Sequence, residues 1–511
     1  MSREHSLDGT PLADQQVTVV GGGIGGLSAA CYLADAGAEV TVVEQNSQLG
    51  GVAGRLEVGE FVFDTGPSWY MMPETFERFF GFFGRSTSDY YELERLDPQY
   101  RVFFTDGDRL DITPDVDRTR QLFESYEPGA GDALDDYLDS AARTFDIGME
   151  RFVYTDRSRF RDLVDPSIVR AAPALGHLGS MQSFVADYFE HPKLQQLLQY
   201  TLVFLGSSPH NTPSLYHLMA HVDFERGVYY PEGGMYSLIE AMVELGEAVG
   251  VDYRTDFAVS ALEPRTDGIR VVGPDTHVAD HVIANANPAH VERELLPASA
   301  VDREPSYWDD RTYGPSAYML YLGVEGDVEP LEHHTLVFPT DWDPHFEAIF
   351  DDPGWPDRPA YYLSVASKTD PSVAPDGHHA IVILVPVAPG LDDTPEQRAA
   401  FREQVLADLA DQTGVDLRDR IVAEESVCVS EFADRFHTPD GTALGLAHTL
   451  RQTGPLRPAH HAPSVDRLYY TGAFTSPGVG VPMALISGEH AAAAVARDVD
   501  GSRFTGLVPN C

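Results

Sequence analysis

The chain has 511 residues, of which 80 are acidic and 35 are basic, and its formal net charge is −45 at pH 7. A polyanion of this kind is repelled by phosphate backbones, so the composition excludes nucleic acid as a partner. Three scattered cysteines give no disulfide framework, which fits a reducing compartment, and no run of about 18 apolar residues predicts a membrane span.

Charge of this size opposes compaction in dilute buffer, whereas molar salt shortens the Debye length to about 3 Å and removes most of the repulsion. We therefore predict a salt-requiring protein from the cytoplasm of an extreme halophile. After dialysis from molar into low salt, we expect lost activity and an expanded chain, measured by assay and by size-exclusion elution. Full activity and compactness in low salt would contradict this prediction.

The predicted elements begin after residues 1–16, a polar and acidic segment without the apolar core of a signal peptide, which we expect to be a disordered leader. Val17–Val20 predicts a strand buried on both faces, and Gly21, Gly23 and Gly26 follow in G-x-G-x-x-G spacing. In a dinucleotide site these glycines permit a tight turn, close approach of the pyrophosphate and packing of the helix on the strand.

The following residues complete the unit. Leu27–Asp35 predicts a helix that ends in a left-handed residue at Gly37, and Val40–Val43 predicts a second buried strand. Free N–H groups at the start of the helix would face the phosphates, and Glu44 can accept hydrogen bonds from the ribose hydroxyls. The unit predicts dinucleotide binding and leaves the choice between FAD and NAD open.

Loop signals suited to the same cofactor come next. Gly50 and Gly51 bring a loop close to another group, and Arg55 can reach a phosphate as a fixed cation. Asp64–Ser68 predicts a strand end that runs into a turn. A hairpin is predicted over 97–113.

Two predicted helix faces are apolar. The first either packs in the core or lines a tunnel, and it consists of Phe76, Phe79, Phe80 and Phe83. The second lies in a mostly helical block, about 114–215, that interrupts the α/β pattern. It belongs either to the core or to a membrane-surface helix, and it consists of Leu194, Leu197, Leu198, Leu202 and Leu205.

The histidines give no recognisable metal site. His217 and His221 have the i, i+4 spacing of metal ligands on a predicted helix, but the sequence offers no third ligand for them, so we expect no metal there. The doublets are expected in surface loops: His333-His334, His378-His379 and His460-His461.

The α/β pattern resumes in the middle of the chain. The elements predicted there are a glycine-containing loop at Tyr229–Met235, a helix at Tyr236–Gly246, and strands at Val251–Leu262, Ile269–Val272 and His281–Ala284. A second interruption spans about 300–460. Its predicted elements include strands at Tyr318–Leu322 and Ile381–Pro386 and a helix at Pro395–Thr413.

A strand, a glycine-rich turn and a helix start recur at Leu468–Met483, before a predicted helix at Ala484–Asp498. This is the anion-holding arrangement of the opening unit. One dinucleotide held from both ends of the chain is typical of a large flavin site, which favours FAD.

These stretches together resemble the bacterial-type phytoene desaturases, FAD-dependent carotenoid desaturases of the amine-oxidase-like flavoprotein group, over about 17–497. The more specific similarities are Asp64–Ser68, Thr369–Ser372 with Ala374, Pro375 and Gly377, and Tyr470–Ala473 with Thr475, Pro477, Gly478, Gly480 and Pro482. The chain departs from the family pattern at Phe474, which is usually small, and at Ser476, which is often His.

The resemblance implies an α/β fold: a discontinuous Rossmann-type FAD-binding domain, an inserted α+β substrate domain and a helical membrane-facing part. The FAD-binding parts would be 17–113, 220–298 and 465–498, with a helical substrate and membrane-docking part at 114–219, a substrate domain at 299–464 and a tail at 499–511. By motif, the cofactor-binding residues would be Gly21, Gly23, Gly25, Gly26, Glu44, Gly50, Gly51, Arg55, Thr65, Gly66, Pro67, Gly472, Ala473, Pro477, Gly478, Gly480 and Val481.

The implied function is desaturation of a C40 carotenoid precursor, phytoene towards lycopene, by hydride transfer from an allylic carbon to the flavin. The alternative is a carotenoid 3,4-desaturase that acts later, in C50 carotenoid synthesis. The implied partners are an apolar polyene and a membrane surface that the cytoplasmic enzyme touches peripherally. No catalytic base stands out, and the electron acceptor is either oxygen or a quinone.

Three further readings remain. A polyene isomerase would share these motifs, and a non-catalytic isoprenoid carrier would not need the intact phosphate loop. An amine oxidase would require a lysine near the flavin, for which only Lys193 and Lys368 exist.

Overall fold

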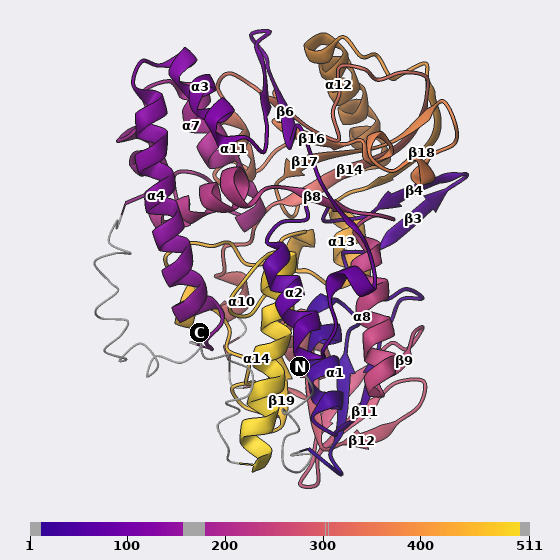
Figure 1. Ribbon diagram of the computed structural model, residues 1–511. Helices are drawn as coiled ribbons and strands as arrows, with labels where there is room; N and C mark the ends of the chain where they lie inside the picture. Colours follow the sequence, from indigo (N-terminus) through magenta and orange to yellow (C-terminus); the bar gives the residue numbers. More distant parts are fainter. Residues whose placement is uncertain (1–11, 157–178, 302, 305, 501–511) are drawn as a thin grey trace.

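The computed structural model describes residues 12–156, 179–301, 303–304 and 306–500. Figure 1 shows a nucleotide-type α/β layer at the bottom, a large sheet above it, and helices α3, α4 and α7 beside that sheet. The N-terminal strands (indigo) and the C-terminal helix (yellow) lie in the same layer. Segments far apart in sequence therefore build one half of the molecule.

The lower layer is centred on a parallel five-stranded sheet. Its order is β19 (Leu468–Tyr470), β13 (His281–Ala284), β1 (Gln16–Val20), β2 (Glu39–Val43) and β9 (Asp252–Arg254). β1 pairs with β13 from Val17 to Val20, and β13 pairs with β19. The predicted assembly from early, middle and late segments is thus seen in the register of the strands.

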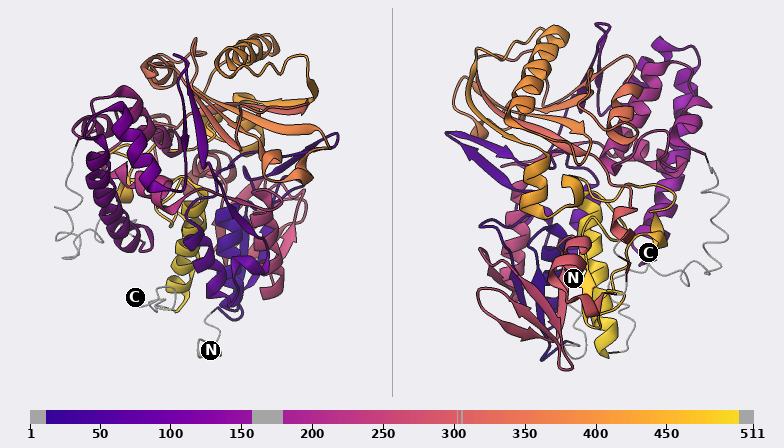
Figure 2. Two further views of the ribbon diagram at one scale, coloured as in Figure 1. Left: turned by 45° about the horizontal axis from the view of Figure 1, so that its top comes forward. Right: turned by 180° about the vertical axis from the view of Figure 1, so that it is seen from behind.

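Helices from the same three segments cover this sheet: α1 (Ile24–Asp35), α8 (Tyr236–Val249) and α14 (Val481–Asp500). The first ends at Asp35, and Gly37 just beyond it has a φ of 96°, in the left-handed region as predicted. α1 and α14 approach closely in both Figure 1 and Figure 2: a Cβ atom on Gly488 would lie 2.4 Å from the Gly25 carbonyl oxygen. A glycine is required at that crossing.

The phenylalanine face belongs to the core. α2 (Pro73–Phe82) buries Phe76, Phe79 and Phe80 in the same apolar cluster as α1, and none of the three lines the large cavity described below. The core interpretation is confirmed, and the tunnel-wall alternative is wrong for these side chains.

A small antiparallel sheet lies beside the parallel one: β10 (Ala261–Pro264), β11 (Ile269–Val272) and β12 (His277–Ala279). The sequence predicted a single strand over Val251–Leu262. Instead, β9 joins the parallel sheet and β10 joins the antiparallel one, with irregular backbone between them. Asp256, which has a φ of 54°, lies in that break.

The upper layer is a mixed seven-stranded sheet. In spatial order its strands are β18 (Ile421–Val427), β14 (Ser316–Glu325), β17 (His378–Val387), β16 (Tyr361–Ser364), β15 (His334–Phe338), β6 (Tyr100–Phe104) and β7 (Arg109–Ile112). The hairpin β6–β7 formed as predicted, but it pairs with β15 and so extends this sheet, although the sequence assigned 17–113 to the nucleotide part. The helices that accompany this sheet are α11 (Asp343–Phe350), α12 (Pro395–Thr413) and α13 (Val429–Phe436).

The helical block flanks the β15–β6–β7 end of that sheet (Figures 1 and 2). Its described helices are α3 (Val116–Tyr126), α4 (Ala130–Gly148), α6 (Met181–Ala186) and α7 (Pro192–Gln199), with a π turn at Met149–Val153 and a 3-10 turn at Tyr200–Leu205. All members of the leucine stripe are buried in one cluster with β6 and β15. They are core residues and not a membrane-facing surface, although Leu205 also reaches the cavity.

The remaining elements connect the layers: β3 (Arg55–Val58), β4 (Phe61–Asp64), β5 (Leu93–Arg95), β8 (Tyr229–Pro231), α9 (Pro288–His290) and α10 (Ser306–Asp309). Leu12, which the sequence assigned to a disordered leader, is buried, and its N–H donates to the Ala36 carbonyl at 3.2 Å. Residues 1–11 and 501–511 of the predicted leader and tail lie outside the described residues. Among the described helices, none is both long and apolar enough to cross a membrane.

Candidate cofactor and substrate site

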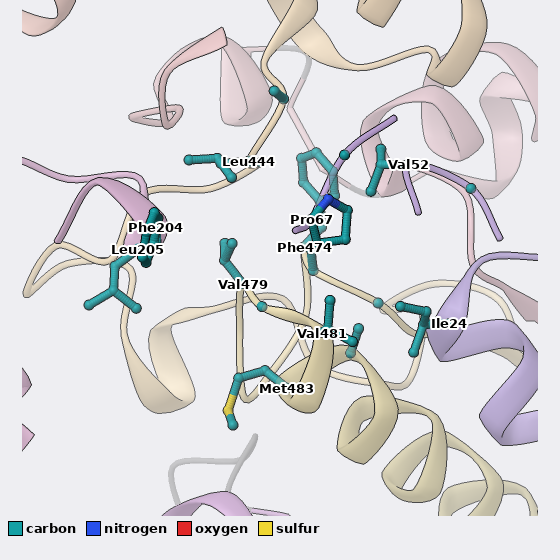
Figure 3. A pocket seen from close by; sticks show the side chains of 18 of the residues that line it. Ile24, Val52, Pro67, Phe204, Leu205, Leu444, Phe474, Val479, Val481 and Met483 are labelled. Carbon is teal, nitrogen blue, oxygen red and sulfur yellow. The ribbon is translucent and has the colours of Figure 1, made fainter. Parts of the chain in front are cut away.

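One cavity of about 830 Å³ joins the two layers. At one end it is lined by the glycine turns after β1 and β19. At the other end it is lined by apolar side chains from the helical block and the seven-stranded sheet, which include Phe145, Met149, Phe152, Val203, Leu218, Leu336, Phe338, Trp342 and Phe346. Figure 3 shows the junction, with Phe204 and Leu205 on one side and Val479 and Val481 of the C-terminal turn across from them.

The turn after β1 has the geometry that its glycines predict. Gly21 has a φ of 101°, and a Cβ atom on Gly26 would lie 2.3 Å from the Gly21 carbonyl oxygen, so the third glycine does let the helix pack on the strand. α1 begins after Gly23 with no side-chain cap, and Gly23, Ile24 and Gly25 line the cavity. The start of this helix is therefore open to a ligand.

Glu44 closes β2 and is itself fixed. Its Oε2 accepts a hydrogen bond from the Gly22 N–H at 2.8 Å, and its Oε1 accepts from the backbone and side chain of Asn46 at 2.9 and 2.7 Å. The side chain lines the cavity and is buried. A carboxylate held in this way offers its remaining lone pairs to a ligand hydroxyl.

The C-terminal turn is held by groups that the sequence analysis did not identify. Arg457 is buried beneath it and donates to the Ala473 carbonyl at 2.8 Å and to the Thr475 carbonyl at 3.3 Å. Ser487 Oγ accepts from the Gly472 N–H at 2.9 Å. Burial lowers the pKa of Arg457 to about 10, so the guanidinium stays charged at neutral pH. It donates charge-assisted hydrogen bonds to these carbonyl oxygens.

His448 holds the same turn from the cavity side. Its Nε2 accepts from the Val479 N–H at 3.1 Å, so Nδ1 carries the proton and donates to the Tyr216 hydroxyl at 2.5 Å. Burial lowers the pKa of His448 well below its usual range, which keeps the ring neutral.

Asn285, at the end of β13, lies where the two turns meet. Its Nδ2 donates to the Gly21 carbonyl at 3.3 Å, and Cβ atoms on Gly23, Gly25 or Gly472 would lie within 3 Å of its amide. The sequence analysis did not assign a role to this asparagine. No spacing rule marks it, because its neighbours come from the turns after β1 and β19.

Two family-like motifs lie outside the glycine turns, Asp64–Ser68 and Thr369–Ser372, and an aspartate from each holds the loop before α8. Asp64 accepts from the N–H groups of Met235 at 2.9 Å and Tyr236 at 3.1 Å, and burial raises its pKa to about 6. Asp370 accepts from the Gly233 N–H at 3.0 Å. These aspartates thus position a loop and do not line the cavity themselves.

Most of the predicted site residues meet around this cavity. Those that line it are Gly21, Gly23, Gly25, Glu44, Gly50, Gly51, Thr65, Gly66, Pro67, Gly472, Ala473, Pro477, Gly480 and Val481. Gly26 and Gly478 lie behind the lining: Gly26 packs on β1, and a Cβ atom on Gly478 would lie 2.3 Å from His448.

Arg55 does not reach the cavity. It lies on β3 and pairs at 3.0 Å with Glu57, which is two residues further along and so on the same face of the strand. The cation that lines the cavity is Arg435, at the end of α13, whose guanidinium also lies near Gly54. Nothing in its local sequence distinguishes it from other arginines.

The apolar end is aromatic at its centre. Trp69 stacks on His334 at 4.2 Å between ring centroids and contacts Phe204 at 5.6 Å. Among the described residues that line the whole cavity, Glu44 is the only carboxylate. The far end is therefore suited to a long ligand without charge.

Three of the six doublet histidines are buried, contrary to the surface loops predicted, and the other three are half-buried. His334 lies on β15 and contacts Tyr362, His333 immediately precedes β15 and contacts Thr369, and His460 is fully buried next to β19. His378 and His379 lie at the start of β17. His217 and His221 bond to different partners, Ser140 and Ser214 for the first and Glu225 and Arg226 for the second.

Neither lysine lines the cavity. Lys193 pairs with Asp106 and Asp108 at 2.8 Å, and Lys368 points to the Glu329 carbonyl at 3.4 Å. The structure therefore gives no support to a lysine-assisted amine oxidation.

Comparisons with known proteins agree with this geometry. A family model described as flavin containing amine oxidoreductase matches residues 24–496. A carotenoid 3,4-desaturase of Haloarcula japonica is 60% identical over 96% of this chain and 99% of that protein. A zeta-carotene-forming phytoene desaturase of Myxococcus xanthus is 32% identical over 93% and 92%, respectively. Cyclohexylamine oxidase of Brevibacterium oxydans has the same fold, with a TM-score of 0.61 at 16% identity over 95% of this chain and 100% of that chain.

Proposed function

The chain belongs to the flavin containing amine oxidoreductase family and is an FAD-dependent oxidoreductase, and from this premise we propose that it introduces the 3,4 double bond into a carotenoid. The observation that carries the proposal is the single cavity that connects the glycine turns to a long apolar end. The sequence analysis placed phytoene desaturation first. The higher identity to a 3,4-desaturase than to a phytoene desaturase favours the alternative instead.

The residues at the polar end fit FAD. The uncapped start of α1, where Gly23, Ile24 and Gly25 line the cavity, suits a pyrophosphate, and Glu44 suits the ribose hydroxyls. Gly66, Pro67 and the Gly472–Val481 turn would border the flavin ring, with Arg435 as the nearby cation in place of Arg55. FAD supplies a two-electron acceptor for hydride when it is bound.

The apolar end would bind the polyene by burial, at about 0.8 kcal/mol per CH₂ group. Desaturation removes one hydride and one proton from neighbouring carbons and leaves a new double bond, so the chain must hold the reacting C–H about 3–3.5 Å from the acceptor and keep water out. The aromatic lining around Trp69 and Phe204 would do both. Two electrons must then leave for an external acceptor, either oxygen or a quinone.

The test uses enzyme purified in molar KCl with FAD, given liposomes that contain either phytoene or lycopene. A 3,4-desaturase converts lycopene to a product whose absorbance is shifted to longer wavelength and leaves phytoene unchanged. Conversion of phytoene alone would favour the second candidate, a phytoene desaturase. Lack of flavin absorbance together with lack of turnover would contradict both.

We also propose that the cavity opens towards a membrane surface through the loop 449–456. Thr453, Gly454 and Pro455 line the cavity, and the flanking Leu450 and Leu456 are 60% and 42% exposed. Such leucines would bury in a bilayer with about 1.5–3 kcal/mol each. Attraction to anionic lipid headgroups would contribute little to a chain with a net charge of −45.

A Leu450→Asp/Leu456→Asp double variant should therefore bind vesicles at least roughly 100-fold more weakly, because two apolar contacts are lost. Cosedimentation with liposomes in molar salt measures this, and the FAD content should not change. Val422→Asp is the matched control, since Val422 is 55% exposed but lies on β18, away from the cavity lining. Equal loss of binding in the control would contradict a docking role for the loop.

A further inference from the structure

A second cluster of ligand-type side chains lies outside the cavity. Asp156 follows the π turn that lines the cavity wall, His460 precedes β19, and His490 lies on α14. One carboxylate oxygen and one ring nitrogen from each histidine all lie within 4.8 Å of one another. His460 and His490 are 0% and 4% exposed. Three segments distant in sequence thus bring three possible metal ligands to one buried point.

The hydrogen bond that the His460 ring makes leaves its other nitrogen as an acceptor. Its Nδ1 lies 3.1 Å from the Tyr470 carbonyl, which can only accept, so Nδ1 carries the proton and Nε2 has a free lone pair. Nε2 is buried without a hydrogen-bond partner. A ring fixed by a backbone carbonyl in this way is the usual arrangement behind a metal-ligating histidine.

His490 is also short of partners. Both of its ring nitrogens are buried without a partner in hydrogen-bonding geometry, although the Tyr154 carbonyl lies near enough to affect its pKa. Two imidazoles from different segments thus present unpartnered nitrogens at one buried point, and an unprotonated ring nitrogen is the form that binds metal.

A purely structural ion-pair network explains only part of this cluster. Arg497 pairs with Asp156 Oδ2 at 3.0 Å, which accounts for the carboxylate charge but leaves the imidazole nitrogens unsatisfied. Each buried polar atom without a partner destabilises a fold. A cation that accepts one lone pair from each ring would give both imidazoles a partner, with the Asp156 carboxylate as a third ligand.

We propose that Asp156, His460 and His490 bind one divalent transition-metal ion, with Zn²⁺ as the best chemical match. Two imidazoles and a carboxylate suit zinc, whereas Mg²⁺ and Ca²⁺ prefer oxygen ligands alone. A water molecule would complete a tetrahedral set. The ion would join the cavity wall at residues 149–156 to α14 and the strand that carries the C-terminal turn, so its role is structural.

The test measures metal content and stability on the FAD-loaded full chain, with ZnCl₂ as the probe. Molar KCl screens weak binding to the many surface carboxylates. After removal of loose metal on a desalting column, we expect one zinc per chain by elemental analysis. Zinc at about 100 times its dissociation constant should raise the unfolding midpoint by roughly 2–3 °C, and chelation should reverse this.

His460→Gln and His490→Gln should each lose the bound zinc and the rise in midpoint. Two controls should keep both: His461→Gln, which changes the neighbouring half-exposed histidine that pairs with Asp498, and Arg497→Gln, which removes the ion pair but no ligand. Flavin absorbance reports whether each variant is folded.

Wild-type protein without bound zinc would overturn the proposal, and so would zinc retained by either ligand variant or lost equally from His461→Gln. If both histidine variants fail to fold, Asp156→Asn is the deciding variant. Asp156 lies at the edge of the cluster with 13% of its side chain exposed, so this substitution should be tolerated by the fold. This variant should bind zinc at least roughly tenfold more weakly. Unchanged zinc affinity would overturn the proposal. No readout depends on desaturase activity.

Discussion

A Gly25→Val variant should purify without FAD. A Cβ atom at this position would lie 2.9 Å from Asn285 Oδ1, 3.0 Å from the Gly472 nitrogen and 3.0 Å from Thr471 Oγ1. Valine adds two further methyl groups to that contact, so the turns after β1 and β19 must separate. Overpacking of this kind costs about 1–3 kcal/mol, and the expected loss of FAD affinity is about 10- to 100-fold. Flavin absorbance per chain measures it.

The matched control is Gly81→Ala. Gly81 lies in α2 with no atom within 4 Å of an added Cβ, so FAD content should match the wild type. Because Gly25 is buried, Glu44→Gln provides a second arm that preserves side-chain size. It should fold, and it should bind FAD about tenfold more weakly, since hydrogen bonds to charged groups are worth about 1.5–3 kcal/mol. Normal FAD content in both Gly25→Val and Glu44→Gln would exclude the two-ended site.

A Phe204→Asp variant should retain FAD but lose desaturation. Phe204 lies in the apolar part of the cavity, half-buried against Trp69 at 5.6 Å and Tyr200 at 6.0 Å between ring centroids. An ionised carboxylate there would have to give up its hydration when a polyene enters, which costs several kcal/mol. We expect kcat/KM to fall at least roughly 100-fold, measured as pigment formed in liposomes.

The Phe204→Leu variant distinguishes the effect of an added charge from the effect of losing the aromatic ring. It keeps an apolar side chain, so kcat/KM should remain within about tenfold of the wild type. Equal losses in both variants would mean that the aromatic ring itself is required. Undiminished turnover by Phe204→Asp would show that the polyene does not pass this part of the cavity.

The local elements could be predicted because their patterns are local. The G-x-G-x-x-G turn, the left-handed Gly37 and the hairpin over 97–113 each depend on residues within a few positions of one another. The helix predicted at Pro395–Thr413 begins and ends at those residues in the structure. The repeated strand–turn–helix pattern predicted that both ends of the chain hold one dinucleotide, and the family resemblance implied that the middle segment joins them.

The remaining features depend on contacts across the fold. Arg55 was expected at a phosphate because it follows the fingerprint, yet it pairs with Glu57 on β3, and Arg435 lines the cavity from 380 positions further along. Asn285, Arg457 and His448 hold the glycine turns through partners on other elements. The burial of His333, His334 and His460 likewise comes from neighbouring strands and not from their doublet spacing.

The close crossing of α14 over α1 has a consequence for biosynthesis. The nucleotide unit is translated first, but Gly488 and the turn that faces Gly25 are made some 450 residues later, so the nascent chain leaves the ribosome with an unfinished cofactor pocket. FAD can therefore bind only after the C-terminal turn has been synthesised. A ribosome-stalled fragment that ends before β19 should contain no FAD and show no flavin absorbance.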